Sequence, residues 1–447
     1  MWQAPASPDE IRARLEAAAV CDGAGYRLCT DGAPPSVVVG VLGEGEPLAA
    51  TDEALVVAAG PELVEALTAL VPALGAARGI LALREDFPGA TRTLRRAAEE
   101  RGLEVRSLPA AYPMDAASVL LDLAASQGQT PAEAGLADAA VVDVPTLDRV
   151  SRALSSRCAA WRSVTVVGAV EQPKVLRVPL GTLVADLVRA CGGSRDAGWI
   201  PFVNGVLGGR PSSGAASVEL DTRLVVVLPH RHPLVVERST PLADLVRQGA
   251  SACVRCRICT EVCPVHLGGG RLEPHLVMAE LSQTGLPGAA SRDARTPAAL
   301  ECTECGLCSV ACPARVRPAE LTAEVARALR ARGVRLVDAA PLAAHPDRAG
   351  RRHATVRLVE RLGLATYRPH GPLPTEELRP LRLVLPLRGP TGAPRLPAVQ
   401  EGDLVRPADR LVLASPGSFE TDVLSAVNGR VRTVGDERGV VIDVQPA

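Results

Sequence analysis

Two cysteine runs carry the chemistry that is visible in the sequence. The first is CVRCRICTEVCP, from Cys253 to Pro264, and the second is CTECGLCSVACP, from Cys302 to Pro313. Both have the spacing C-x2-C-x2-C-x3-C-P, with which cysteine thiolates hold [4Fe–4S] clusters. Three closely spaced cysteines surround one cluster, and the fourth, which proline follows, ligates the other cluster. The two runs are therefore expected to fold against each other.

The predicted ligand sets cross between the runs. One set is Cys253, Cys256, Cys259 and Cys312, and the other is Cys302, Cys305, Cys308 and Cys263. Zinc is the alternative, because cysteines at this spacing also build zinc ribbons. A zinc site takes four ligands from two C-x2-C pairs, which leaves the third cysteine and the following Cys-Pro of each run unexplained. The spacing therefore favours iron.

Length and composition limit what surrounds these sites. A chain of 447 residues exceeds a single hydrophobic core, so several domains are expected. A net charge of −1 and an aromatic content of 2% argue against a nucleic-acid partner, which would select for basic and stacking side chains. Lys174 is the only lysine, which excludes lysine-based mechanisms almost everywhere.

No membrane span or signal peptide is expected from the sequence. The most apolar stretch, residues 66–83, is interrupted by Pro72, Gly75 and Arg78, and the first residues include acids. A cytoplasmic location follows, which agrees with the reduced thiolates that clusters require. The cysteines outside the two runs are scattered singly and are expected to be small buried side chains: Cys21, Cys29, Cys158 and Cys191.

Residues 1–154 are expected to form an α/β domain of the nucleotide-binding kind. Apolar periodicity predicts helices at 8–19, 61–71 and 90–101, the first with Ser7 as its N-cap. Buried strands are predicted at 36–43, 79–83 and 104–108. Strands that alternate with helices indicate a parallel sheet.

The remainder of the chain divides into four predicted units. Residues 160–230 have short strands and one helix, which suggests an α+β unit such as a β-grasp. Residues 240–333 hold the cysteine runs in a mostly helical frame, in which His266 and His275 either tune a cluster by hydrogen bonding or are merely packed. Residues 334–380 are expected to be a linker, and residues 381–447 a small all-β domain.

The order of these parts resembles the C subunit of the Rnf electron-transport complex and, more closely, the cobalamin reductases of propanediol-utilisation microcompartments. The runs HPLVVERSTPL, CRICTEVCPVHL and ALECTECGLC are similar to sequences of that family. The resemblance implies a domain like the flavin-binding subunit of complex I, an SLBB β-grasp, a dicluster ferredoxin and a barrel-sandwich. Biotinyl and lipoyl carriers share that last fold, but they need an acceptor lysine, which is missing here, so a swinging-arm role is excluded.

The same resemblance implies a site for FMN and NADH in the first domain. Its expected residues are Gly23, Gly25, Tyr26, Glu44, Glu46 and Tyr112. Several positions depart from the family pattern. Asp22 places negative charge where a phosphate is expected, and Asp115 and Ala117 replace a glycine and a glutamate. The sequence therefore predicts a degenerate flavin and nicotinamide module.

The function expected from the sequence is iron-sulfur electron transfer through two [4Fe–4S] clusters between redox partner proteins, such as a flavoprotein or a cobalamin-dependent enzyme system. One alternative is a reductase that uses NADH and FMN. Another is a structural adaptor in a redox complex or microcompartment. The resemblance is compatible with a microcompartment lumen and with peripheral association at the inner face of a membrane.

Overall fold

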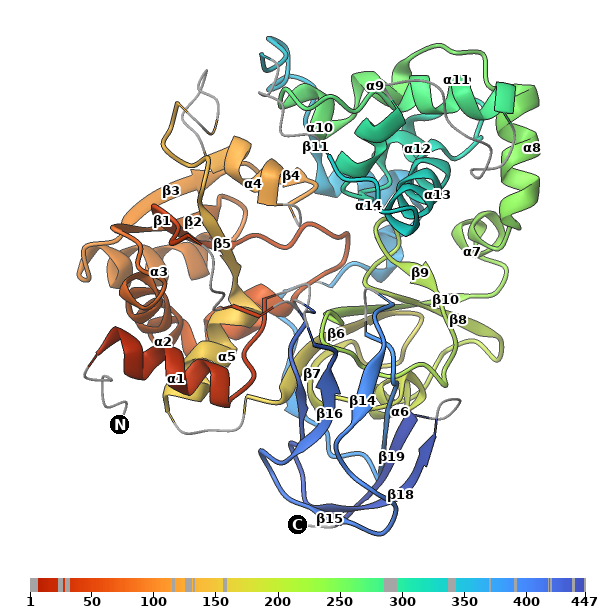
Figure 1. Cartoon of the computed structure of the whole chain (residues 1–447). Helices are drawn as coiled ribbons and strands as arrows, with labels where there is room; N and C mark the ends of the chain where they lie inside the picture. Colours follow the sequence, from red (N-terminus) through yellow and green to blue (C-terminus); the bar gives the residue numbers. More distant parts are fainter. Residues whose placement is uncertain are drawn as a thin grey trace.

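The computed structural model describes residues 7–22, 27–28, 33–114, 117–124, 131, 133–155, 159–284, 296–336, 343–369, 371–389, 392–416, 418, 420–435 and 439–445. Figure 1 shows three regions. An N-terminal α/β region is coloured red to yellow. Green and teal helices form a second region, and yellow-green and blue strands lie together in a third.

The N-terminal region is a parallel sheet with helices on both faces, which confirms the predicted α/β alternation. Its strands have the order β3-β2-β1-β5 and are β1 (Val37–Leu42), β2 (Arg78–Arg84), β3 (Glu104–Leu108) and β5 (Ala140–Asp143). Every residue of β1 is buried, as expected for a central parallel strand. One face packs on α1 (Pro8–Ala17), α2 (Thr51–Ala73), α3 (Pro88–Glu99) and α5 (Val144–Leu154), and the other on α4 (Ala117–Ala124). Ser7 caps α1 as predicted, since its side chain accepts from the N–H of Glu10.

Helix α2 is longer than the sequence predicts. The predicted helix, which begins at Pro61, corresponds to the second of two helical segments. The first begins at Thr51, and the non-helical backbone of Ala59 forms a kink between them. At this length, α2 is the one helix among the described residues that is long and apolar enough to cross a membrane. It packs against α1, α3 and α5, so its apolar side chains contribute to the core of the α/β region.

The middle of the chain forms a six-stranded mixed sheet with the order β12-β7-β6-β10-β8-β9. Its strands from this part of the chain are β6 (Trp161–Gly168), β7 (Lys174–Pro179), β8 (Trp199–Val203), β9 (Arg210–Pro211) and β10 (Leu224–Pro229). Strand β10 runs parallel to β6 and antiparallel to β8. Helix α6 (Val184–Ala190) packs its buried Val184, Leu187 and Val188 into the core beneath the sheet.

Residues 334–380, expected to be a linker, contribute strands to two neighbouring regions. Strand β11 (His353–Ala354) pairs with β4 (Ala111–Tyr112) of the N-terminal region. Strand β12 (Thr375–Glu377) is added parallel to β7 at the edge of the middle sheet. Between them lie α14 (Thr355–Arg361) and a short 3-10 helix, Ala365–Tyr367. This segment therefore ties the regions together, because its backbone hydrogen bonds are made with both of them.

The cysteine runs lie in a helical region, as predicted. Its longer helices are α8 (Leu242–Ala252), α11 (Pro274–Thr284) and α13 (Pro318–Ala331), and its shorter elements are α7 (Pro233–Arg238), α9 (Ile258–Glu261), α10 (Pro264–Leu267), the 3-10 helix Thr296–Glu301 and α12 (Leu307–Ala311). Apolar side chains of α8, α11 and α13 share one core, which includes Met278 and Leu321. The long helices thus form a rigid frame behind the short cysteine-bearing ones.

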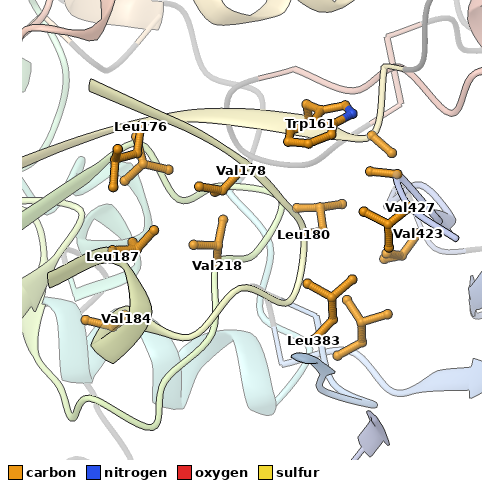
Figure 2. Packing of buried hydrophobic residues seen from close by; sticks show 14 of the residues in the cluster. Trp161, Leu176, Val178, Leu180, Val184, Leu187, Val218, Leu383, Val423 and Val427 are labelled. Carbon is orange, nitrogen blue, oxygen red and sulfur yellow. The ribbon is translucent and has the colours of Figure 1, made fainter. Parts of the chain in front are cut away.

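The C-terminal residues form two small sheets, as the all-β prediction requires. One has the order β13-β19-β18-β15 and the other β14-β16-β17. Their strands are β13 (Arg382–Leu385), β14 (Arg395–Pro397), β15 (Leu404–Val405), β16 (Arg410–Ala414), β17 (Val423–Leu424), β18 (Gly429–Gly435) and β19 (Gly439–Val444). Figure 2 shows Leu383, Val423 and Val427 packed beside Leu180 and Trp161 of the middle sheet. The two β regions therefore share one hydrophobic core.

A buried group of charges lies where these β regions meet. Arg395 and Glu420 form an ion pair of 2.8 Å, with side chains that are 3% and 2% exposed. Glu219 interacts with both, and its Oε2 atom is buried without a hydrogen-bond partner among the described residues. Burial raises the pKa of Glu219 to about 7, with Asp221 adding to the rise and Arg395 opposing it.

Glu219→Gln is expected to stabilise the protein at pH 8 and to change little at pH 5. Because the folded-state pKa of about 7 lies above the ordinary value of 4.5, the contribution of Glu219 is fully present below pH 4.5 and is lost as the pH rises through 7. Glutamine cannot ionise, so the thermal midpoint at pH 8 should rise by about 2 °C. The exposed Glu62→Gln is the control. An equal gain for both variants, or the same gain at both pH values, would contradict this prediction.

Candidate metal centre

The two cysteine runs fold into loops with the same backbone conformation. Arg255 and Arg257 have positive φ angles of 54° and 65°, and the equivalent Glu304 and Gly306 have 55° and 76°. A short helix follows each loop, α9 in the first and α12 in the second. Left-handed residues in such a turn direct successive backbone N–H groups into one concavity, which is how nests bind anionic groups at many iron-sulfur sites.

The first group of thiols lies around one cavity. Cys253, Cys256 and Cys259 line it together with Cys312, which comes from the other run. Burial, together with the smaller effects of the nearby Cys253, Cys312 and Cys256, raises the pKa of Cys259 to about 11. The fourth cysteine of the second run thus lies beside the first three of the first run.

The second group has the reciprocal arrangement. Burial raises the pKa of Cys308 well above its ordinary value, and Cys305, Cys263 and Cys302 add to that rise in this order. Cys263 itself is buried, and Cys305 and Cys302 also raise its pKa. The structure therefore brings together both sets of four cysteines that the sequence predicts as ligands. Cluster binding by these cysteines stays a prediction.

Backbone N–H groups surround the buried sulfur atoms. Those of Val265 and His266 form hydrogen bonds with Cys263, and that of Leu307 forms one with Cys305. The N–H of Glu304 donates to Cys302 Sγ at 3.4 Å. These bonds lower the pKa values that burial raises, but burial remains the larger effect. The donor set fits thiolates whose charge is balanced by bound iron, because a metal cation reverses the effect of burial on a coordinating thiol.

A threonine that the sequence analysis did not single out contacts the first group. The hydroxyl of Thr260 forms a hydrogen bond with Cys259 that lowers the pKa of this thiol. His275 Nδ1 lies 2.8 Å from Thr260 Oγ1, and the backbone N–H of His275 donates to the same oxygen at 3.2 Å. Of the two histidines considered, His275 thus reaches a cysteine through Thr260. His266 contacts Cys263 through its backbone.

The remaining cysteines lie apart from these groups where the structure describes them. Cys21 and Cys191 are both fully buried, as predicted for small apolar side chains. Cys29 and Cys158 lie outside the described residues. Within the described parts of the chain, no three His, Cys, Asp or Glu side chains are close enough together to hold a single metal ion.

Glu46 and Tyr112, predicted for the flavin and nicotinamide site, meet the second cysteine loop instead. The Tyr112 hydroxyl donates to the carbonyl oxygen of Cys305 at 2.6 Å and lies 3.1 Å from Glu46 Oε1. The Glu46 carboxylate also accepts from the N–H of Gly208 at 2.5 Å and from that of Leu207 at 3.3 Å. Residues 204–209 connect β8 with β9, so three regions meet at this carboxylate.

Two glycines permit this junction. A Cβ atom at Gly205 would lie 2.2 Å from Glu46 Oε2, and one at Gly306 would lie 3.1 Å from the carbonyl oxygen of Leu207. Both residues also have positive φ angles, of 98° and 76°. Only glycine satisfies both conditions without strain. The sequence contained a signal for this contact in the paired acids of the run EGEP, but nothing in it identified the partner loop.

Glu44 lies in the same acidic run but keeps its contacts within the N-terminal region. Its Oε1 atom accepts from the N–H of Asp52 at 2.8 Å, and the guanidinium of Arg84 donates to its backbone carbonyl. Burial raises the pKa of Glu44 well above its usual value, and the Asp52 carboxylate raises it further. The other predicted flavin-site residues, Gly23, Gly25 and Tyr26, lie outside the described residues.

Three protein-family models match the chain. A 4Fe-4S dicluster domain matches residues 252–317, the Nuo51 FMN-binding domain matches residues 29–152, and the SLBB domain matches residues 163–211. The dicluster match spans both cysteine runs in full and continues to Arg317. Both motif loops and the short helices that follow them therefore lie inside the matched range.

Similar proteins come from redox systems. The chain is 30% identical to the cobalamin reductase PduS of Salmonella typhimurium, over 98% of this chain and 97% of that protein. It is 26% identical to the C subunit of the proton-translocating ferredoxin:NAD(+) oxidoreductase complex of Clostridium ljungdahlii, over 54% and 51% of the two chains. Among solved structures, an NAD+-reducing [NiFe]-hydrogenase in the H2-reduced state matches with a TM-score of 0.48 and 19% identity, over 74% of this chain and 64% of the other.

Proposed function

We propose that the eight motif cysteines hold two [4Fe–4S] clusters in an electron-transfer path, because this chain belongs to the family of cobalamin reductase PduS and the related C subunits. The observation that carries the proposal is the crossed grouping of thiols. Each group takes three cysteines from one run and the fourth from the other run. When bound, each cluster accepts and releases one electron.

The proposed ligands are assigned by that grouping. Cys253, Cys256 and Cys259 act with Cys312, and Cys302, Cys305 and Cys308 act with Cys263. The chain supplies thiolates, backbone N–H donors to the sulfur atoms, and burial that keeps water away from the second group. These are the features by which a protein sets a cluster potential.

The junction at Glu46 supports a route between the N-terminal region and the second group. Tyr112 and Glu46 hold the loop of Cys305 against a region that matches an FMN-binding domain. Electrons that arrive in that region would thus pass first to the cluster of Cys302, Cys305, Cys308 and Cys263. Both are positioning residues. Tyr112 bonds to the backbone carbonyl of Cys305, and Glu46 bonds to the N–H groups of Leu207 and Gly208, which cover the loop.

The finer domain assignments belong to the same proposal. Residues 1–154 form the flavin-binding-like domain, residues 160–230 an SLBB β-grasp, residues 240–333 the ferredoxin domain and residues 381–447 a barrel-sandwich. The single helix under the middle sheet supports the second assignment, and the two small facing sheets support the last. The proposed partners are redox proteins in the cytoplasm, at the inner face of a membrane or in a microcompartment.

Anaerobic purification with iron, sulfide and flavin quantified together tests this function. The expected result is about eight iron atoms and eight sulfides per chain, with electron paramagnetic resonance signals of reduced [4Fe–4S] clusters after dithionite. Zinc without acid-labile sulfide would refute iron binding. If dithionite failed to reduce the bound clusters, the alternative function as a structural adaptor would be favoured.

A second candidate is a reductase that uses NADH and FMN, and the match to the Nuo51 FMN-binding domain favours it. In this chain the second cysteine loop engages Tyr112, and Tyr112 and Leu207 engage Glu46. Gly23, Gly25, Tyr26 and Glu44 would remain to bind flavin or nicotinamide. Reconstitution with FMN distinguishes the candidates. Retained flavin absorbance together with bleaching of the cluster bands by NADH would establish the reductase.

Thr260→Val is expected to lower the reduction potential of the first cluster only. Valine keeps the shape of threonine but loses the hydroxyl that bonds to Cys259, and hydrogen bonds to the sulfur ligands stabilise the more negative reduced cluster. A redox titration followed by electron paramagnetic resonance measures both potentials. Thr322→Val is the matched control, because Thr322 is also buried in this region and its hydroxyl has no partner among the described residues. An unchanged first potential in Thr260→Val would contradict the prediction.

A further inference from the structure

A cavity of about 420 Å³ lies between the loop 204–209, helix α7 and the second cysteine run. This volume is usual for small-molecule sites, which span roughly 300–1,000 Å³. Buried residues of its lining include Val206, Leu207 and Gly306. Cys312 lines this cavity and also the one around the first group of thiols. A molecule bound here would therefore lie against residues of both cysteine groups.

Apolar side chains make up much of the lining. Pro233 and Leu234 come from α7, Val310 comes from α12, and Leu362 directly follows α14. Leu234, Val310 and Leu362 pack against one hydrophobic core cluster, which fixes their positions. Such a lining suits an aromatic ring system, because it removes the faces of the rings from water.

Four arginines and two glutamates also line the cavity. Arg238 and Arg317 both form ion pairs with Glu320, and Arg317 Nη2 lies 2.6 Å from Glu320 Oε1. Burial opposes the ionisation of Glu320, but the two arginines outweigh it and hold its pKa below the ordinary value. Two guanidinium groups thus share one carboxylate, which leaves an excess of one positive charge in this part of the lining.

The other two arginines are exposed. Neither Arg315 nor Arg361 forms an ion pair with any residue that the structure describes. Arg361 donates to the carbonyl oxygen of Val310 at 3.0 Å, which holds its side chain beside α12. The half-buried Glu237 is the one acid of the lining that opposes them, so the cavity as a whole remains positive. Guanidinium groups are well suited to bind anionic oxygens through paired N–H groups.

We propose that this cavity binds a planar aromatic anion that accepts two electrons, such as an anionic quinone, and that Arg315 and Arg361 hold its charged group. The inference rests on the proposed function, in which the motif cysteines hold two clusters. Cys312 belongs to the first cluster, and Gly306 follows Cys305 of the second in the chain. The cavity thus borders two single-electron centres, which together supply the electron pair that a quinone needs.

The reaction balances with the two reduced clusters as the only reductant. Each cluster gives up one electron and returns to its oxidised form. The quinone takes both electrons together with two protons from the solvent, which form the two O–H bonds of the hydroquinone. No bond to the protein is made or broken. The exposed side chains of Arg315 and Arg361 show that solvent reaches this part of the cavity.

Naphthoquinone sulfonate and menadione test the site, because they share one ring system and differ in charge. The holoprotein is reduced with dithionite, freed of the excess and mixed with each quinone in stopped flow, and the rate of cluster reoxidation is measured against quinone concentration. The rate should saturate with the sulfonate. In Arg315→Gln/Arg361→Gln, the half-saturating concentration should rise about tenfold or more for the sulfonate and less than about twofold for menadione, which carries no charge.

Arg255→Gln/Arg257→Gln is the matched control. Both arginines lie in the exposed first loop and line the cavity of the first thiol group, so the same charge is removed beside the same cluster but outside the proposed site. This variant should change the half-saturating concentration of the sulfonate less than about threefold. Leu362→Trp should raise that concentration for both quinones, because a larger side chain occupies the apolar part of the cavity.

Calorimetric titration with naphthalene sulfonate, which cannot accept electrons in this way, measures binding without electron transfer. The oxidised holoprotein should bind it, and Arg315→Gln/Arg361→Gln should bind it about tenfold more weakly. If dithionite failed to reduce the clusters while this binding remained, the proposed function and the electron step would fail and the anion site would stand. The proposal is overturned if the reoxidation rate never saturates with the quinone sulfonate, or if Arg315→Gln/Arg361→Gln behaves like the control.

Discussion

Cys312→Ala should abolish the cluster of the first cysteine run and preserve that of its own run. Cys312 lies with Cys253, Cys256 and Cys259, although it is the fourth cysteine of the second run. Removal of one of four thiolate ligands is expected to cost the whole cluster, so iron should fall from about eight to about four atoms per chain. The surviving electron paramagnetic resonance signal should equal that of Cys253→Ala and differ from that of Cys302→Ala.

Cys191→Ala is the matched control for this experiment. Cys191 is a fully buried cysteine beneath the middle sheet, outside both groups, so both clusters should remain. The reciprocal variant Cys263→Ala should give the signal of Cys302→Ala. If Cys312→Ala instead shared its spectrum with Cys302→Ala, each run would hold its own cluster and the crossed assignment would be refuted.

Glu46→Gln should destabilise the junction at the second cysteine loop by about 2 kcal/mol or more. The Glu46 carboxylate accepts from the N–H groups of Leu207 and Gly208 and lies beside the Tyr112 hydroxyl. In glutamine an NH2 group replaces one of the two carboxylate oxygens. This NH2 group cannot accept a hydrogen bond, so one buried N–H loses its acceptor. The thermal midpoint should fall by several degrees, and the signal of the second cluster should change while that of the first does not.

Glu44→Gln provides the contrast, since the same substitution is made two residues away in the same acidic run. The pKa of Glu44 is raised well above its usual value, so its stabilising contribution is lost as the pH rises through that folded-state pKa. Glutamine resembles the neutral acid and avoids this loss, so stability should hold or rise at pH 8. Equal destabilisation by both substitutions would show that Glu46 has no special role at the junction.

Local patterns were sufficient to predict the elements. Ser7 before Pro8, the all-apolar β1 and the alternation of helices with strands predicted an α/β region, and the structure has it. Only the second part of helix α2 was predicted. Pro61 does interrupt the helical geometry, at Ala59, but the segment before it from Thr51 is helical too and both parts pack against the neighbouring helices. Residues 334–380 were expected to be a linker because strands of two and three residues leave almost no periodic signal.

The sequence by itself was enough to predict the cysteine centre, since the C-x2-C-x2-C-x3-C-P spacing constrains short loops whose conformation depends on neighbouring residues. Cys312 and Cys263 could be assigned across the runs because the fourth cysteine of this motif, which proline follows, ligates the other cluster. Only the tertiary structure decided what lies against each loop. Glu46 and Leu207 are more than a hundred and fifty residues apart in the sequence, and Leu207 and Cys305 are nearly a hundred apart. No local pattern encodes contacts at such separations. The covered second loop and the exposed first loop follow from that packing.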